Sequence, residues 1–347
     1  LSTIAAPCCN LIALYMGFGS IGLSLVTTVL QFAMLPLNAV YCFKVLRIRP
    51  RFRGLPIQLI KELLQFSAFI FLGSVVDMLF WATDKVILGM LASTAVVAVY
   101  NIGTSFNTMM TNISTAFSGV LTPKVTVMVT KDATPGQLTE LFIRVGRLQY
   151  LIIALALSGF IVFGKQFIIL WAGSDYENAY YMALVTLIPL AVPLIQNTGL
   201  SIVIAQNKHK FRSIVYLVIA VLNVISTYLV VPYWGGLGAA VCSGISYTIG
   251  QIIIMNIYYY KVTKLDILAF WANIGKMSLI PAGMTIVGMR GTSKNDLSSW
   301  GMLLAMILLY TAIYSAGMYF FVMNDYEKDV VRKPVFKVLG KMGIRKR

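Results

Sequence analysis

The feature that most constrains this chain is a series of apolar runs, each long enough to cross a lipid bilayer. About 20 apolar residues in helical form span the roughly 30 Å of hydrocarbon. Backbone groups in lipid must bond within their own segment, so each run is expected to be helical. Because 59% of the 347 residues are hydrophobic and 12% are charged, we predict an all-α polytopic membrane protein. About ten transmembrane helices are expected, at residues 1–16, 20–43, 63–83, 94–121, 148–163, 179–205, 213–231, 236–258, 274–289 and 300–323.

The loops between these runs alternate in charge, and this alternation predicts the orientation. Basic residues gather in every second loop, at 44–61, 124–147, 206–212 and 261–276, and in the tail after residue 323. All but four of the 28 basic residues belong to this set; the exceptions are Lys85, Lys165, Arg290 and Lys294. Loops rich in Lys and Arg stay in the cytoplasm, so the C-terminus is predicted to be cytoplasmic. The same rule accounts for the net charge of +16, so we expect contact with membrane lipids and no nucleic-acid partner.

Motifs that carry catalysis or bind metals and cofactors are not found in the sequence. The cysteines Cys8, Cys9, Cys42 and Cys242 lie in apolar runs without metal or disulfide spacing, and His209 is the single histidine. No phosphate-binding glycine loop or nucleophile elbow is present. We therefore expect no metal site, no cofactor and no enzymatic activity.

The stretch 66–123 contains the strongest functional signal. The helix expected at 63–83 has Asp77 deep in its apolar run, and Asp84 and Lys85 at its end. The next helix has a polar stripe at helical spacing: Asn101, Thr104, Ser105, Thr108, Thr111, Asn112 and Thr115. Polar and acidic residues in lipid-length helices indicate a wet path inside a bundle. These two helices are therefore predicted to line the pathway of a transporter.

The two acids in this stretch have more than one interpretation. A carboxylate inside a bilayer must be paired, hydrated or protonated. Asp77 is either an ion-coupling site or a polar contact that pins helices together. Asp84 lies seven residues later on the same helical face and is a second candidate for ion coupling. The alternative for Asp84 is an interfacial pair with Lys85 at the helix end.

The second and eighth crossings resemble each other and suggest an internal repeat. They begin with Gly19-Ser20-Ile21-Gly22 and Gly235-Gly236-Leu237-Gly238. An even number of crossings separates them, which is typical of parallel repeats. The predicted domains are the last two helices of an N-terminal lobe (1–45), a basic inter-lobe loop (46–62), a six-helix C-terminal lobe (63–262), two additional helices (263–323) and a basic tail (324–347). On this plan, four helices precede residue 1, so we expect the chain to be truncated at its N-terminus.

Short motifs in a fixed order connect the chain to a known family. They are Leu63-Leu64-Gln65-Phe66-Ser67, Asp84-Lys85-Val86-Ile87-Leu88-Gly89, Ala98-Val99-Tyr100-Asn101-Ile102, Pro123, Trp171 with Gly173, Ile204-Ala205-Gln206-Asn207-Lys208 and Gly235-Gly236-Leu237-Gly238-Ala239-Ala240. In this order the chain resembles the Wzx-type oligosaccharide flippases. These are polysaccharide-biosynthesis membrane proteins of the multidrug/oligosaccharidyl-lipid/polysaccharide exporter superfamily.

The resemblance implies a two-lobe exporter fold of six, six and two helices around a central cavity, in the bacterial cytoplasmic membrane. It implies alternating access, which moves an undecaprenyl-diphosphate-linked oligosaccharide to the outer leaflet for surface polysaccharide assembly. It also implies coupling to a proton or sodium gradient, and polysaccharide assembly proteins as potential partners. The chain departs from the family in lacking the first four helices.

A lipid-diphosphate sugar needs cations for its phosphates, hydroxyl and amide groups for its sugar, and an apolar slot for its prenyl chain. Asn101, Ser105, Thr108 and Asn112 are the candidates for the sugar. Arg144 and Arg147 are the candidates for the diphosphate, because the arginine fork fits phosphate oxygens; the alternative is cytoplasmic anchoring. Two other functions stay open: a cation-coupled drug exporter of the same superfamily, and a membrane-embedded polysaccharide polymerase or ligase.

Overall fold

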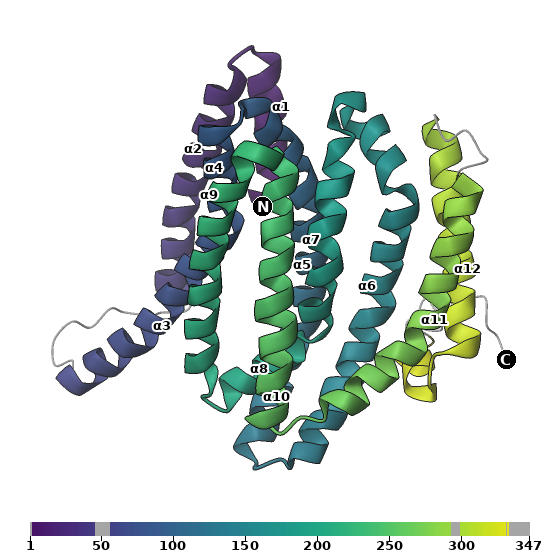
Figure 1. Cartoon of the computed structure of the whole chain (residues 1–347). Helices are drawn as coiled ribbons and strands as arrows, with labels where there is room; N and C mark the ends of the chain where they lie inside the picture. Colours follow the sequence, from purple (N-terminus) through teal and green to yellow (C-terminus); the bar gives the residue numbers. More distant parts are fainter. Residues whose placement is uncertain (1, 46–55, 293–298, 331, 333–347) are drawn as a thin grey trace, which may run out of the picture. The chain divides into compact units, whose positions relative to one another are not determined.

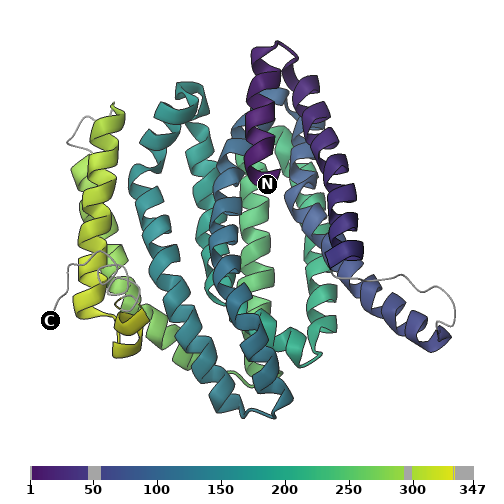
Figure 2. The same cartoon turned by 180° about the vertical axis from the view of Figure 1, so that it is seen from behind.

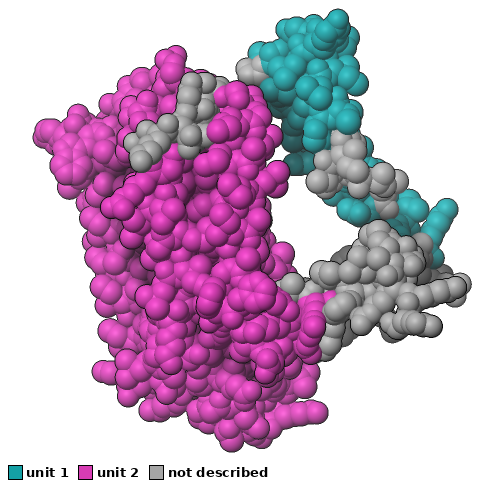
Figure 3. Space-filling view, turned by 90° about the vertical axis from the view of Figure 1, so that its right-hand side faces the viewer, with its two compact units in different colours: residues 1–65 teal, residues 66–347 magenta. Residues whose placement is uncertain are grey.

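The computed structural model describes residues 2–45, 56–292, 299–330 and 332, and every regular element in these ranges is a helix. The chain forms two compact units, residues 1–65 and residues 66–347 (Figure 3). Six helices of the described ranges are long and apolar enough to cross a membrane. The expected all-helical membrane architecture is therefore confirmed.

The first unit is a helical hairpin followed by the start of a third helix. It contains α1 (Ser2–Tyr15), α2 (Gly19–Val40), a π-helical turn (Tyr41–Val45) and the beginning of α3 (Ile57–Trp81). Gly17 and Gly19, with φ of 82° and 55°, form the turn between α1 and α2. Side chains with a Cβ are strained at positive φ, so glycine suits both positions. Most large apolar side chains of the hairpin are exposed within the unit, as expected for helices that face lipid or other helices.

The second unit contains the remaining helices. They are α4 (Thr83–Leu91), α5 (Thr94–Thr130), α6 (Pro135–Ala172), a 3₁₀ turn (Ser174–Tyr176), α7 (Asn178–Ile195), α8 (Asn197–Ala205), α9 (His209–Tyr247), a π-helix (Thr248–Ile254), α10 (Met255–Lys261), α11 (Ile267–Thr292) and α12 (Trp300–Phe321). Within this unit α7 packs against α5, α6 and α9, while α11 and α12 pack against α6 (Figures 1 and 2). The additional helices α11 and α12 therefore adjoin the α6 side of the unit.

Several helix boundaries differ from the expected ones. After a break at Ala82 the path of α3 continues as α4, so the chain turns at Ala92 and Ser93 instead of directly after residue 83. The segment labelled α9 contains two predicted crossings. Its ribbon reverses direction between them, at Gly235, where φ is 52° (Figure 1). Helices α5 and α6 extend beyond their apolar runs. Hydropathy detects the lipid-length part of a helix, whereas hydrogen bonding continues past it.

Local sequence explains where the long helices begin. Ser93 caps α5 by accepting a hydrogen bond from the Val96 amide. Thr134 and Gln137 form a reciprocal capping box at the start of α6, with Pro135 as the first helical residue. These caps satisfy amide groups that have no partner inside the helix.

Small residues allow the helices of the second unit to approach closely. A Cβ added to Gly103 of α5 would lie 2.9 Å from the carbonyl oxygen of Ala179 on α7. A Cβ added to Gly244 of α9 would lie 2.6 Å from the carbonyl oxygen of Val185, also on α7. Helix association in lipid depends on such close packing, because no hydrophobic effect drives it. The two glycines hold α7 at the centre of the unit.

Candidate functional site

The predicted polar stripe of α5 lies mainly on an exposed face of the second unit. Asn101, Thr108 and Asn112 are exposed, and Ser105 is half-buried. The hydroxyl of Ser105 donates to the carbonyl of Ile102. Other stripe hydroxyls bond in the same way to carbonyls of their own helix. The stripe is therefore a polar surface whose amide groups are available to a ligand.

A second set of polar residues on α5 is buried and holds the helices together. Asn107 and Thr186 of α7 exchange hydrogen bonds of 2.9 and 3.1 Å. Ser114 donates to the carbonyl of Leu194 at 2.6 Å and accepts from Gln149 of α6 at 3.2 Å. The sequence did not predict a role for these residues, because they fall between the polar stripe and the apolar face. Their signal was an Asn and a Ser seven residues apart, which places both on one face.

A polar pocket of about 270 Å³ adjoins the stripe. Its lining residues come from α5, α7, α8, α9, the π-helix and α10: Thr111, Thr115, Leu190, Pro193, Leu194, Gln196, Asn197, Leu200, Arg212, Tyr216, Tyr247, Gln251 and Tyr259. We call it the Arg212 pocket, because Arg212 is its one charged lining residue within the described part of the chain. The sequence pattern predicted Arg212 only as one of the basic residues of the loop 206–212.

Two irregular helical segments form walls of the Arg212 pocket. Helix α7 contains Pro189 and Pro193 and ends before Gln196, after which α8 begins. A proline inside a helix removes a backbone hydrogen bond, which explains the interruption. On the opposite wall, Gln251 belongs to the π-helix. Irregular helices within membranes are typical of segments that line cavities.

A separate buried cluster surrounds Asp84. Its carboxylate accepts hydrogen bonds from Tyr100 at 2.7 Å, Ser243 at 2.6 Å and Thr227 at 3.3 Å. Asn223 donates to Ser243 at 3.3 Å. Helices α4, α5 and both arms of α9 therefore meet at one carboxylate, which is 1% exposed. We call these residues the Asp84 cluster.

Lys85 does not form the expected helix-end pair in this structure. The ion pairs in the described part of the chain join other residues, and Lys85 is half-buried. The carboxylate of Asp84 instead relies on three hydroxyl donors. Their signal in the sequence was weak, since Thr227 and Ser243 lie within long apolar runs and more than 140 residues from Asp84.

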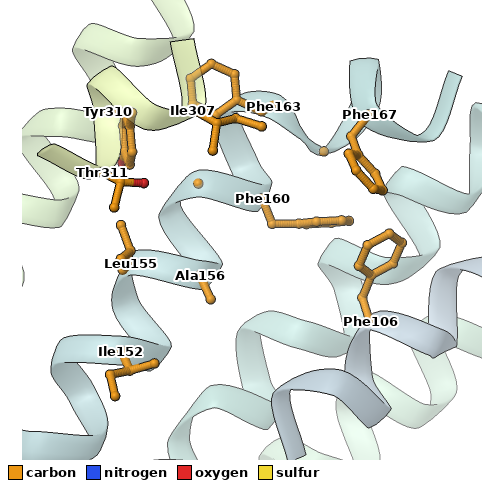
Figure 4. Close-up of a pocket in the computed structure, with 12 residues that line it drawn as sticks. Phe106, Ile152, Leu155, Ala156, Phe160, Phe163, Phe167, Ile307, Tyr310 and Thr311 are labelled. Atoms are coloured by element: carbon orange, nitrogen blue, oxygen red, sulfur yellow. The ribbon is translucent and has the colours of Figure 1, made fainter. Parts of the chain in front are cut away.

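An apolar pocket of about 380 Å³ lies between α5, α6 and α12 (Figure 4). Phe106, Phe160 and Phe167 form an aromatic wall, with ring centroids 4.6 Å apart for Phe106–Phe160 and 6.2 Å apart for Phe106–Phe167. Ile307, Tyr310 and Thr311 line the α12 side. The buried hydroxyl of Tyr310 has no hydrogen-bond partner in the described structure. This pocket suits a hydrocarbon chain more than a polar ligand.

Comparison with known proteins identifies the family. Residues 1–181, just over half of the chain, match the family described as polysaccharide biosynthesis protein. The chain belongs to the polysaccharide biosynthesis protein family. No curated protein matches it. Among solved structures it is similar to the lipid II flippase MurJ in its inward closed conformation, with a TM-score of 0.66 and 16% identity over 94% of this chain and 68% of that chain.

These matches confirm the resemblance found in the motifs. Both the polysaccharide biosynthesis family and the MurJ fold fall within the expected exporter superfamily. The protein is a multi-pass helical membrane protein with a flippase-type fold. The predicted division into lobes at residues 45 and 62 stays a prediction.

In this family member the predicted arginines already have protein partners. Arg147 forms a two-point ion pair with Glu327, at 2.5 and 2.9 Å, and donates to the carbonyl of Val322 at 3.2 Å. Arg144 lies 3.6 Å from Glu140 and 4.2 Å above the ring of Tyr326. Arg147 and Arg144 thus both connect α6 to the segment after α12.

Asp77 and Asp84 are the two acids predicted as ion-coupling sites. Asp77 belongs to α3, but its side chain lies outside the part of the structure that is described. Asp84 is described fully and is 1% exposed. No group of three or more His, Cys, Asp or Glu side chains in the described ranges could hold a metal ion.

Proposed function

We propose that this protein flips a polyprenyl-diphosphate-linked oligosaccharide across the cytoplasmic membrane, by alternating access, for surface polysaccharide assembly. The observation that supports this most is the polar pocket with its arginine and amides, which lies among helices that are apolar enough to cross a membrane. Family membership and the MurJ fold agree with it. MurJ is a flippase of lipid II, and we propose a lipid-linked substrate for this chain as well.

The chemistry of the second unit meets the three requirements of such a substrate. The exposed stripe residues Asn101, Thr108 and Asn112 offer amides and hydroxyls to a sugar. The Arg212 pocket offers a cation. The apolar pocket with its phenylalanine wall offers a slot for a prenyl chain. Helix α5 contributes to all three, because Phe106 lines the apolar pocket and Thr111 lines the polar one.

The same geometry argues against the two alternative functions. A cationic drug would require an acid in the open site, yet no acidic side chain lines the Arg212 pocket in the described structure. A polymerase or ligase would need a nucleophile or an acid–base pair open to substrate. Asp84 is buried and bonded to three hydroxyls instead. A transporter fits this distribution of groups.

Our proposal includes ion coupling at Asp84, with Asp77 as a second site. A carboxylate that accepts three hydroxyl bonds can take up a proton or a sodium ion when those hydroxyls rotate. Tyr100, Thr227 and Ser243 come from α5 and from the two arms of α9. A change of charge at Asp84 would alter how these helices hold together. Uptake of an ion and rearrangement of the unit would thereby be linked.

The proposed orientation has the C-terminus in the cytoplasm, and the basic loops support it through the positive-inside rule. The inner leaflet would then be the side on which the substrate is loaded. Enzymes that build the lipid-linked unit inside, and polysaccharide assembly proteins that use it outside, are the partners we propose.

The decisive experiment is deletion of the gene, followed by localisation of the lipid-linked units. We expect surface polysaccharide to be lost and the lipid-linked units to accumulate in the inner leaflet. Restoring the protein should restore the outer-leaflet pool. Normal translocation in the deletion strain would refute the proposed function.

For the coupling site, Asp84→Asn and Asp77→Asn should each change the dependence of transport on the ion gradient. Unchanged dependence rules out the residue concerned.

A further inference from the structure

Two donors in the Arg212 pocket have no acceptor within the described part of the chain. Among the described residues, neither the guanidinium of Arg212 nor the amide of Gln251 hydrogen-bonds to another protein group. Arg212 is half-buried and stacks 4.2 Å from the centroid of the Tyr216 ring. The ring offsets only part of the cost of removing the charge from water. A half-buried cation without a carboxylate is suited to an anion that comes from outside the chain.

Arg147 differs from Arg212 in that its charge is neutralised by a carboxylate of the same chain. Arg147 has Glu327 and a backbone carbonyl as partners. Arg212 has no carboxylate within ion-pair distance among the described residues. Its neighbour Lys210 is exposed, whereas the Arg212 side chain lines the pocket. Simple anchoring at the cytoplasmic surface would not require Arg212 to enter a pocket.

The remaining lining of the pocket fits a phosphate attached to a sugar. Thr111 and Thr115 bring hydroxyl oxygens, and Gln251 brings a whole amide. Asn197 brings its amide oxygen, because its amide nitrogen donates to Ser114 at 3.2 Å. Hydroxyl and amide groups bond to sugar hydroxyls, while the arginine fork bonds to two phosphate oxygens at once. A volume of about 270 Å³ is at the lower end of ligand pockets. It suits a headgroup rather than a whole oligosaccharide.

We propose that Arg212 binds the diphosphate of the lipid-linked substrate, and that Gln251 and Asn197 contact the sugar next to it. This inference rests on the proposed function and assigns its phosphate-recognition site to α9 and the π-helix, in place of Arg144 and Arg147. The ligand chemistry is a lipid diphosphate. Phosphatidylglycerol and inorganic diphosphate share part of that chemistry and serve as competitors.

The test measures binding of undecaprenyl diphosphate to the full-length protein in phosphatidylcholine nanodiscs. Arg212→Gln should weaken binding by about 10- to 100-fold, the range for hydrogen bonds to a charged group. Arg212→Lys should recover part of the affinity, because it restores charge but not the fork. Lys261→Gln is the matched control: Lys261 is exposed at the end of α10 and does not line the pocket. It should bind like the wild type.

Each outcome separates this inference from the function on which it rests. If wild type and Arg212→Gln bind undecaprenyl diphosphate equally, the site is wrong while the flippase proposal stands. If Lys261→Gln weakens binding as much as Arg212→Gln, general electrostatic attraction explains the result and the site is wrong. If phosphatidylglycerol or inorganic diphosphate competes at equal concentration through Arg212, the pocket holds any phosphate and the assignment to substrate fails. Failure of the flippase proposal is recognised separately, by normal translocation in the deletion strain.

Discussion

The Asp84 cluster and the Arg212 pocket are two polar regions of one helical unit, and they are built in opposite ways. Asp84 is 1% exposed and its carboxylate accepts three hydroxyl bonds. Arg212 lines an open pocket and stacks on one tyrosine. In the first region every polar side chain hydrogen-bonds to another one of the cluster, whereas in the second the guanidinium of Arg212 and the amide of Gln251 donate to no acceptor among the described residues. A closed region holds helices together and admits at most a small ion, whereas an open one admits a large ligand.

The largest loss of unfolding free energy is expected at a third polar group, the ion pair of Arg147 and Glu327. Glu327→Ala removes the two-point ion pair of Arg147, whose side chain is 11% exposed, and leaves it only the neutral partners Asn273 and the Val322 carbonyl. Breaking such a pair from one side typically costs about 3–5 kcal/mol of unfolding free energy. Denaturant unfolding in detergent micelles measures this loss. The control is Glu140→Ala at the exposed pair with Arg144, where a loss of less than about 1 kcal/mol is expected.

The Asp84 cluster should behave like a closed region. Asp84→Ala leaves the hydroxyls of Tyr100, Thr227 and Ser243 without their acceptor. We expect unfolding free energy to fall by about 1–3 kcal/mol, the cost of leaving buried polar groups unsatisfied. Asp84→Asn keeps an acceptor oxygen and should lose less stability. An unchanged denaturation midpoint in Asp84→Ala would mean that the cluster does not hold the unit together.

The Arg212 pocket should behave in the opposite way. Arg212→Ala removes one cation–π contact, so its stability should fall by only about 0.5–1 kcal/mol. Transport should nevertheless be lost, if the pocket recognises substrate. The measurement pairs denaturant unfolding with the outer-leaflet pool of lipid-linked units. If Arg212→Ala unfolds as easily as Asp84→Ala, both regions are structural and the distinction fails.

The smallest stability effect is expected on the exposed stripe. Thr108→Val and Asn112→Ala change side chains that are exposed in this unit, so unfolding free energy should stay within about 0.5 kcal/mol. Substrate turnover should decline, since hydroxyl and amide groups that face the sugar are lost. Met109→Leu on the neighbouring exposed surface is the control, with no expected change in either measurement. Full transport by both stripe variants would remove the stripe from the pathway.

Much of the architecture could be predicted because bilayer thickness imposes one length on every crossing. The helical class followed from that length, and the exposed stripe followed from its spacing. The roles of Asn107 and Ser114 could not be predicted, since their partners Thr186 and Leu194 lie about 80 residues away in sequence. Spacing along one helix shows which residues share a face. It does not show which face meets another helix.

The charged residues were harder to predict for a related reason. A basic residue near the end of an apolar run satisfies the positive-inside rule whether it pairs with Glu327, as Arg147 does, or lines a pocket, as Arg212 does. Asp84 was placed at a helix end because its apolar run stopped there. In the structure the helical path continues through α4 and buries it. Hydropathy locates the boundary of a crossing, but the partners across the bundle decide the role of each charge.

The reversal of α9 at Gly235 has a consequence for how the protein is made. Thr227 and Ser243 lie eight residues before and after Gly235, which places both at the same depth, roughly 12 Å from the turn along each arm. The two arms form one hairpin, in which both hydroxyls donate to the Asp84 carboxylate. Because α4 precedes α9 in the chain, we expect Asp84 to be made without these two partners and to gain both at once when the α9 hairpin inserts.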